Sequence, residues 1–158
     1  MSSDWLIPAG IIFLTVAAME LTAAAVHRHL MHGPGWGWHR SHHEPSEGRF
    51  ERNDLYAALF AGVSVLLFVL GGRWPLLWWV GAGTVAYGLL YTFVHDGLVH
   101  RRFPFLKVPR SGYLKRLVQA HRLHHAVRTR GGAVSFGFLY APPVDRLRAK
   151  LRGENALR

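Results

Sequence analysis

The stretch LIPAGIIFLTVAAMELTAAAVHRHLMH, residues 6–32, holds both features that decide the fold: a long apolar run and a histidine pair that follows it. Residues 6–26 carry one charged side chain, Glu20. As a helix this run is about 31 Å long, which matches the hydrocarbon core of a bilayer. Residues 1–5 lack Lys and Arg and include Asp4, whereas a signal peptide begins with basic residues. The run therefore predicts a membrane-spanning helix that is not cleaved.

Two further apolar runs, residues 55–72 and 74–94, are separated only by the turn at residues 71–73. A link that short predicts an antiparallel hairpin of two spanning helices. The apolar run at residues 133–144 is too short for a span and fits a re-entrant or interfacial segment better, with a fourth crossing left open. We expect an all-α membrane bundle with three spanning helices, forming one domain over residues 1–158.

The basic residues predict the orientation of this bundle. The chain has 19 Lys and Arg against 9 Asp and Glu, and three crossings place all the basic residues except Arg73 on one side, in residues 27–54 and 95–158. Because cytoplasmic segments carry the excess of Lys and Arg, we expect the N-terminus outside and these two segments in the cytoplasm. Topology thus explains the charge, and no stacking motif points to a nucleic-acid partner. The absence of cysteine excludes disulfides, iron–sulfur clusters and thiol nucleophiles.

Ten of the eleven histidines form four clusters with the spacings HxxxxH, HxxHH, HxxxxH and HxxHH. On an α-helix, positions i, i+3 and i+4 share a face, so each HxxHH triplet can direct three imidazoles at one metal. Positions i and i+5 are about 140° apart on an α-helix, so HxxxxH requires a wider or frayed turn. All four clusters fall on the predicted cytoplasmic side. The candidate metal ligands are His27, His32, His39, His42, His43, His95, His100, His121, His124 and His125.

The number of histidines favours an open redox site over a structural one. Two octahedral metals have about twelve coordination positions, so ten imidazoles leave about two for water, an oxide bridge or O2. Structural zinc is closed and four-coordinate, and would need fewer ligands. Imidazole suits zinc, copper, iron and nickel, so the ligands alone do not name the metal. His29, which lies outside the pattern, is expected to be a helix-end or membrane-interface residue.

The motifs closely resemble those of the bacterial beta-carotene hydroxylases of the fatty acid hydroxylase superfamily, over about residues 5–140. They are HRHLMH at 27–32, HRSHH at 39–43, NDLYA at 53–57, HDGLVHRRFPF at 95–105 and AHRLHHAVRTRGGAVSFGF at 120–138. The resemblance implies a bacterial inner-membrane, non-haem di-iron monooxygenase whose two irons are held by the ten histidines. It also implies that O2 and electrons from ferredoxin and its reductase are used, and that zinc can replace iron in a purified sample.

The same resemblance implies the reaction. It is hydroxylation of carbon 3 of the β-ionone rings of β-carotene, giving β-cryptoxanthin and then zeaxanthin, or astaxanthin from ketolated carotenoids. Such substrates enter from the bilayer, through a groove whose aromatic candidates are Tyr91 and Phe93. The small residues proposed to line this groove equally fit close helix packing, the reading we favour. They are Ala82, Gly83, Ala86 and Gly88.

Three acids near the cytoplasmic ends of the spans, Asp96, Asp54 and Glu20, are candidates for orienting ligand imidazoles. A helix cap for Asp54 and a solvated acid for Asp96 are equally open interpretations. The basic face could dock an acidic ferredoxin as well as anionic membrane lipid.

Two other functions stay open. One is another membrane di-iron oxygenase, such as a carotenoid ketolase or a fatty-acid or sterol hydroxylase. The other is a non-enzymatic membrane metal-binding or metal-transport protein. A transporter would place polar ligands at mid-bilayer, and the predicted spans contain no histidine at that depth.

Overall fold

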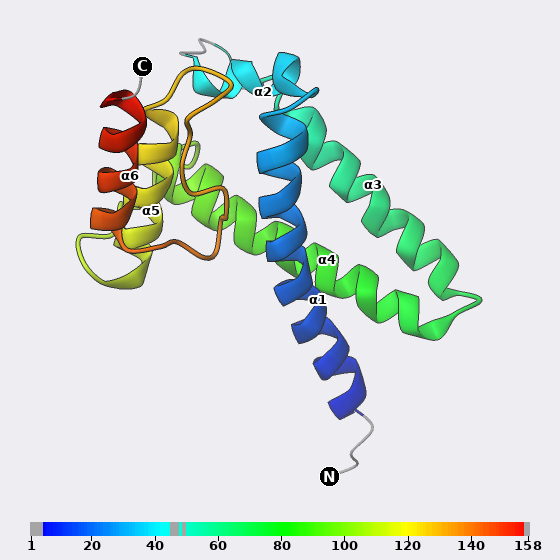
Figure 1. Ribbon diagram of the computed structural model, residues 1–158. Coiled ribbons are helices and arrows are strands. Elements are labelled where there is room, and N and C mark those ends of the chain that lie inside the picture. The colour runs from blue at the N-terminus through cyan, green and yellow to red at the C-terminus, as the bar shows by residue number, and fades with distance from the viewer. Residues whose placement is uncertain (1–4, 45–47, 49, 157–158) are drawn as a thin grey trace.

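The computed structural model describes residues 5–44, 48 and 50–156, and over these residues its regular structure is entirely helical. Three long helices form the body of the molecule, and two of them continue directly into π-helices (Figure 1). These elements are α1 (Leu6–Ala25) with η2 (Val26–Met31), α3 (Asp54–Gly71), and α4 (Pro75–Tyr91) with η3 (Thr92–Val99). Three shorter helices gather at one end of the long ones: α2 (Trp36–His43), α5 (Gly112–His125) and α6 (Val144–Ala156).

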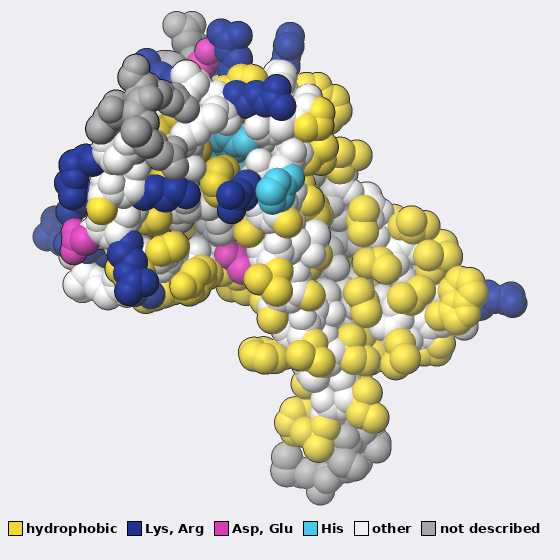
Figure 2. All heavy atoms as spheres, in the orientation of Figure 1, with side chains coloured by type: hydrophobic (Ala, Val, Ile, Leu, Met, Phe, Trp, Pro, Cys, Tyr) yellow, Lys and Arg dark blue, Asp and Glu magenta, His cyan; other side chains and the backbone are white. Residues whose placement is uncertain are grey.

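The three long helical segments are long and apolar enough to cross a membrane, as predicted. They are Leu6–Met31, Asp54–Gly71 and Pro75–Val99. Their apolar side chains point outward, with Phe13, Leu21 and Val69 each more than 70% exposed. Figure 2 shows these hydrophobic side chains over the long helices, whereas Lys and Arg gather over the end that carries α5 and α6. Because so much apolar surface is unfavourable in water, the long helices are suited to contact lipid.

The first and third spans extend further than predicted because π-helical turns continue them into the HxxxxH pairs. The backbone N–H of His32 donates to the carbonyl of His27, and that of His100 to the carbonyl of His95, each at 3.0 Å. These i to i−5 bonds define the π-helix and provide the wider turn that the five-residue spacing requires. Both histidines of each pair therefore project toward the same side of the helix end.

Close packing between α1 and α4 depends on Gly83. A Cβ atom at Gly83 would lie 2.5 Å from the Cβ of Thr15 on α1, so only glycine allows this approach of the two helices. This contact agrees with the helix-packing interpretation of Gly83.

The apolar run at residues 133–144 does not form a fourth spanning helix, because most of it is irregular chain leading into α6. Ala133, Val134 and Phe138 are buried within it. Glu20 of α1 secures this segment, since its Oε1 accepts hydrogen bonds from the backbone N–H groups of Phe138, Leu139 and Tyr140. The acid in the first span therefore serves to fix a loop against the membrane helices.

Candidate metal centre

The structure brings all ten predicted histidines together, in two groups of five. Within each group one ring nitrogen of every histidine lies within 4.8 Å of the others. The first histidine group consists of His27, His32, His39, His43 and His124. The second histidine group consists of His42, His95, His100, His121 and His125.

Each HxxHH triplet contributes to both groups. On α2, His39 and His43 face the first group while His42 faces the second; on α5, His121 and His125 face the second group while His124 faces the first. The middle histidine of each triplet thus crosses to the opposite group. The expectation that one triplet serves one metal is therefore wrong, because i and i+4 lie on one side of the helix face and i+3 on the other.

Neutral oxygen atoms orient the histidines of the first group. The Nδ1–H groups donate to backbone carbonyls of the segment 127–136, except that of His39, which donates to Oδ1 of Asn53 at 2.7 Å. The carbonyl pairs are His27 with Phe136, His32 with Arg130, His43 with Val127 and His124 with Val134, at 2.9–3.0 Å. Because an oxygen acceptor fixes the proton on Nδ1, each Nε2 presents a lone pair to the centre of the group.

Carboxylates orient two histidines of the second group. His42 Nδ1–H donates to Glu51 at 2.8 Å, and His95 Nδ1–H donates to Asp96 at 2.7 Å. Arg102 contacts both Glu51, at 3.3 Å, and Asp54, at 2.9 Å. The second group therefore has negative outer partners, which increase the basicity of its imidazoles.

The spacing of the Nε2 atoms fits a metal ion at the centre of each group. Neighbouring Nε2 atoms lie 2.9–3.2 Å apart, as in the pairs His27–His39 and His42–His95. Where both histidines of a pair carry their proton on Nδ1, both Nε2 atoms are acceptors, so no hydrogen bond can join them. Ligand nitrogens about 2.1 Å from a shared cation and at right angles would be about 3.0 Å apart. In addition, Nε2 of His100 is buried without a hydrogen-bond partner among the described residues.

Burial keeps the histidines outside the spans neutral. It lowers the pKa of His39 to about 3, and those of His43 and His100 to about 4. It also lowers the pKa of His121 and His124 well below the ordinary value. Neutral imidazole is the form that binds a metal, so at pH 7 no proton has to leave these side chains before metal binds.

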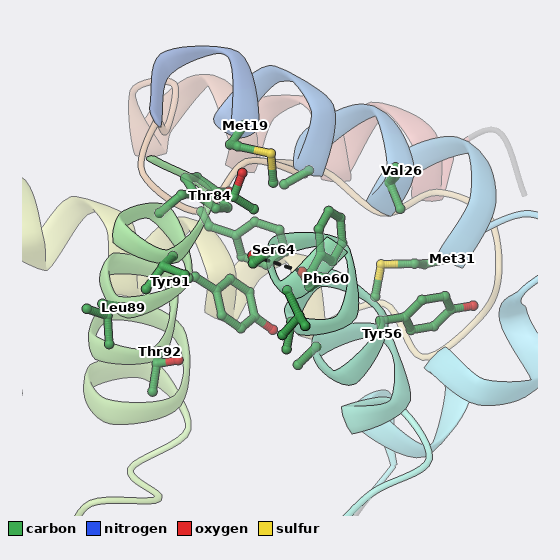
Figure 3. Close-up of a pocket in the computed structure, with 18 of the residues that line it drawn as sticks. Met19, Val26, Met31, Tyr56, Phe60, Ser64, Thr84, Leu89, Tyr91 and Thr92 are labelled. Atoms are coloured by element: carbon green, nitrogen blue, oxygen red, sulfur yellow. Dashed lines mark hydrogen bonds between the residues drawn. The ribbon is translucent and has the colours of Figure 1, made fainter. Parts of the chain in front are cut away.

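An apolar cavity of about 420 Å³ lies between α1, α3 and α4, on the membrane side of the histidines (Figure 3). Its hydroxyl groups are largely occupied by protein acceptors: Ser64 and Thr84 donate to carbonyls of their own helices, and Tyr87 donates to Glu20. The remaining lining is mostly aliphatic and aromatic. The cavity is thus suited to a hydrocarbon and falls within the usual size range of ligand pockets.

Two aromatic side chains separate this cavity from the histidines. Phe138 stacks on His27 with ring centroids 5.1 Å apart and contacts His95 at 5.3 Å. Tyr91 stacks on His95 at 4.6 Å and contacts Phe138 edge to face. A molecule in the cavity therefore approaches both groups past these two rings.

The other predicted site residues have varied positions. Tyr91 and Gly88 line the cavity, whereas Phe93 is 42% exposed and, like Ala82 and Ala86, is not part of the lining. His29 is exposed and belongs to neither group.

Two of the three acids proposed to orient imidazoles contact no histidine among the described residues. Asp54 accepts hydrogen bonds from the Glu51 backbone N–H and from Arg102, and Glu20 secures the loop described above. Of these three acids, only Asp96 bonds a histidine directly. The expectation that Asp54 and Glu20 orient imidazoles is therefore corrected: Asp54 contacts Glu51 and Arg102, and Glu20 contacts the loop.

The sequence prediction missed the outer partners Glu51 and Asn53 and the carbonyls of residues 127–136. Both side chains follow the HRSHH motif closely, and that proximity was the only available signal. The carbonyls carry no signal at all, because any residue supplies one.

Comparisons with known proteins identify the family of the chain. The fatty acid hydroxylase model matches residues 12–149. A beta-carotene hydroxylase of Pantoea ananas is 61% identical over 156 residues, covering 98% of this chain and 89% of that protein. A beta-carotene hydroxylase of Paracoccus sp. (strain PC1) is 56% identical over 150 residues, covering 94% and 93%.

A more distant relative is the chloroplastic beta-carotene 3-hydroxylase 1 of Arabidopsis thaliana, 40% identical over 141 residues, covering 84% of this chain and 45% of that protein. No solved structure matches the chain. Since the family model and these relatives cover most of the sequence, the chain belongs to the fatty acid hydroxylase family.

Proposed function

We propose that the protein is a non-haem di-iron monooxygenase that hydroxylates carbon 3 of the β-ionone rings of β-carotene, giving β-cryptoxanthin and then zeaxanthin. Ketolated carotenoids would give astaxanthin by the same reaction. The observation that carries the proposal is the position of two five-histidine groups directly beside an apolar cavity. The high identity to proteins named beta-carotene hydroxylase supports this choice of substrate.

In this proposal each histidine group holds one iron through five Nε2 atoms. The pair of irons, when bound, would activate O2 so that it can oxidise an unactivated C–H bond. The Nδ1–H partners keep each imidazole in the right tautomer and orientation. The absence of cysteine leaves no thiol near the centre to be oxidised.

The cavity would bind one end ring of the carotenoid from the bilayer. Its walls are mostly apolar, and the hydroxyl groups of Ser64, Thr84 and Tyr87 already donate to protein acceptors. Phe138 and Tyr91 would contact the ring where it meets the histidines. The protein thereby orients carbon 3, which limits reaction at other carbons.

We place the histidine groups on the cytoplasmic face of the bacterial inner membrane, with the N-terminus outside. The support is the distribution of basic residues, since Arg73, in the turn between α3 and α4, is the only one on the other side. Ferredoxin and ferredoxin reductase would then supply electrons from the cytoplasm.

The test is expression in bacterial cells that accumulate β-carotene, with the carotenoids separated by chromatography. Zeaxanthin formed by way of β-cryptoxanthin is the expected result, and a His124→Ala variant should form none. A different oxidised product would identify another di-iron oxygenase. No product from a protein with two bound metals would instead indicate a metal-binding protein without this activity.

A further inference from the structure

A surface hollow lies over the histidine centre where α2, η3 and α5 end, and it shares no lining residue with the apolar cavity. It has a volume of about 310 Å³, and histidine rings form much of its lining. His42, His43, His100 and His125 all line it, and the last two are only half-buried. Solvent therefore comes within one imidazole ring of the centre here.

The rings in this hollow connect the two histidine groups. His125 of the second group stacks on His43 of the first with centroids 4.4 Å apart. His125 also contacts His42 at 4.7 Å and His100 at 4.8 Å. An electron that arrives at the edge of His125 thus has a short path to either group.

The proposed hydroxylation, on which this inference rests, requires electrons from outside the chain. One oxygen atom of O2 enters the C–H bond, and the other leaves as water after taking up two electrons and two protons. The chain has no cysteine, so it has no iron–sulfur cluster of its own to supply them. An external reductant must therefore deliver two electrons close to the histidines in each turnover, and a one-electron carrier does so in two visits.

The rim of the hollow is positively charged. Arg122 and Arg128 are both exposed, and neither forms an ion pair with a described residue. Glu44, the acid in the lining, is paired with Arg40 at 2.7 Å and adds no net negative charge. The surface is therefore complementary to a negatively charged partner.

We propose that this hollow is the docking site of an acidic one-electron carrier protein, which transfers its electrons through the edges of His100 and His125. Each carrier is oxidised by one electron, and two carriers in succession complete the reduction. Arg122 and Arg128 attract and orient the carrier without touching the substrate.

The test compares Arg122→Glu/Arg128→Glu with the charge-matched control Arg146→Glu/Arg152→Glu on α6. Each iron-loaded protein is embedded in zwitterionic nanodiscs, and its affinity for a reduced plant-type ferredoxin is measured over a range of salt concentrations. We expect the first variant to lose roughly tenfold to hundredfold in affinity at low salt and to show a weaker salt dependence. The control should lose much less.

Two further measurements separate this inference from the proposed function. Iron content should be unchanged in both variants, and turnover supported by dithionite with a small mediator should be the same as in the parent. Equal ferredoxin affinity in the first variant and the parent would overturn the docking site, as would equal losses in the two variants. A loss of binding to anionic vesicles, with ferredoxin affinity retained, would identify a lipid surface and also overturn it. Failure of the parent to hydroxylate carotenoid with any reductant would refute the proposed function, while ferredoxin binding would still report on the hollow.

Discussion

The two histidine groups have the same ligand pattern but different surroundings. Each combines one HxxxxH pair, the outer two histidines of one triplet and the middle histidine of the other. In the first group the outer partners are four backbone carbonyls and the amide of Asn53. In the second they include the carboxylates of Glu51 and Asp96. The repeated histidine motifs therefore build two equal ligand sets but unequal metal sites, because the outer partners come from residues outside the motifs.

The largest expected effect, on activity and metal content, follows removal of the middle histidine of a triplet, which belongs to a different group from the outer two. His124→Ala takes one ligand from the first group and should leave the second intact, whereas His42→Ala should do the reverse. We expect hydroxylation to be abolished in both and metal content to fall from two ions per chain toward one, measured by elemental analysis. His29→Tyr is the control and should retain full metal and activity. Loss of both metals in His124→Ala alone would contradict the assignment of the ten histidines to two separate metal sites.

A smaller effect is expected from exchanging the outer partners. Glu51→Gln makes the second group more like the first, and its metal should bind roughly tenfold to hundredfold more weakly. Asn53→Asp is the reciprocal change and should strengthen metal binding at the first group. Competition with a chelator during metal titration measures both. Arg102 keeps Asp54 as a partner in Glu51→Gln, so the fold should be retained. Identical affinity changes at the two sites in either variant would argue against inequivalent sites.

The smallest effect concerns pH and should be common to both groups. Burial lowers the pKa of His43 and His100 to about 4, from an ordinary value of 6.5 in the unfolded chain. Below pH 6.5 the unfolded chain therefore binds more protons than the folded one, and stability falls until about pH 4. The thermal midpoint of the metal-free protein in detergent should decrease over this interval and stay level above pH 7. A midpoint unchanged down to pH 4.5 would contradict neutral, buried histidines.

Much of this architecture was predictable from the sequence because strong physical constraints act on it. The three apolar runs have to satisfy their backbone groups inside a bilayer, and this requires helices. The five-residue histidine spacing required a widened turn, and π-helices supply it at both pairs. The ten candidate ligands stood out because their spacing repeats.

The remaining features depend on tertiary contacts that no local pattern records. The helical spacing separates the middle histidine of each triplet from the outer two, but the group that His42 and His124 join follows from how α2 and α5 face each other. The apolar run at residues 133–144 reads as a re-entrant or interfacial segment, yet the carbonyls of Val134 and Phe136 and the ring of Phe138 contact histidines of the first group. From its sequence position Glu20 is a candidate for orienting ligand imidazoles, but its carboxylate accepts hydrogen bonds from three backbone N–H groups of the run at residues 133–144.

The exchange of middle histidines also determines when the centre can form during synthesis. His124 and His121 lie late in the chain, so neither group is complete until α5 has left the ribosome. The nascent spans can insert into the bilayer while only partial ligand sets exist. Metal capture is thereby postponed until the three long helices that line the cavity have all been synthesised.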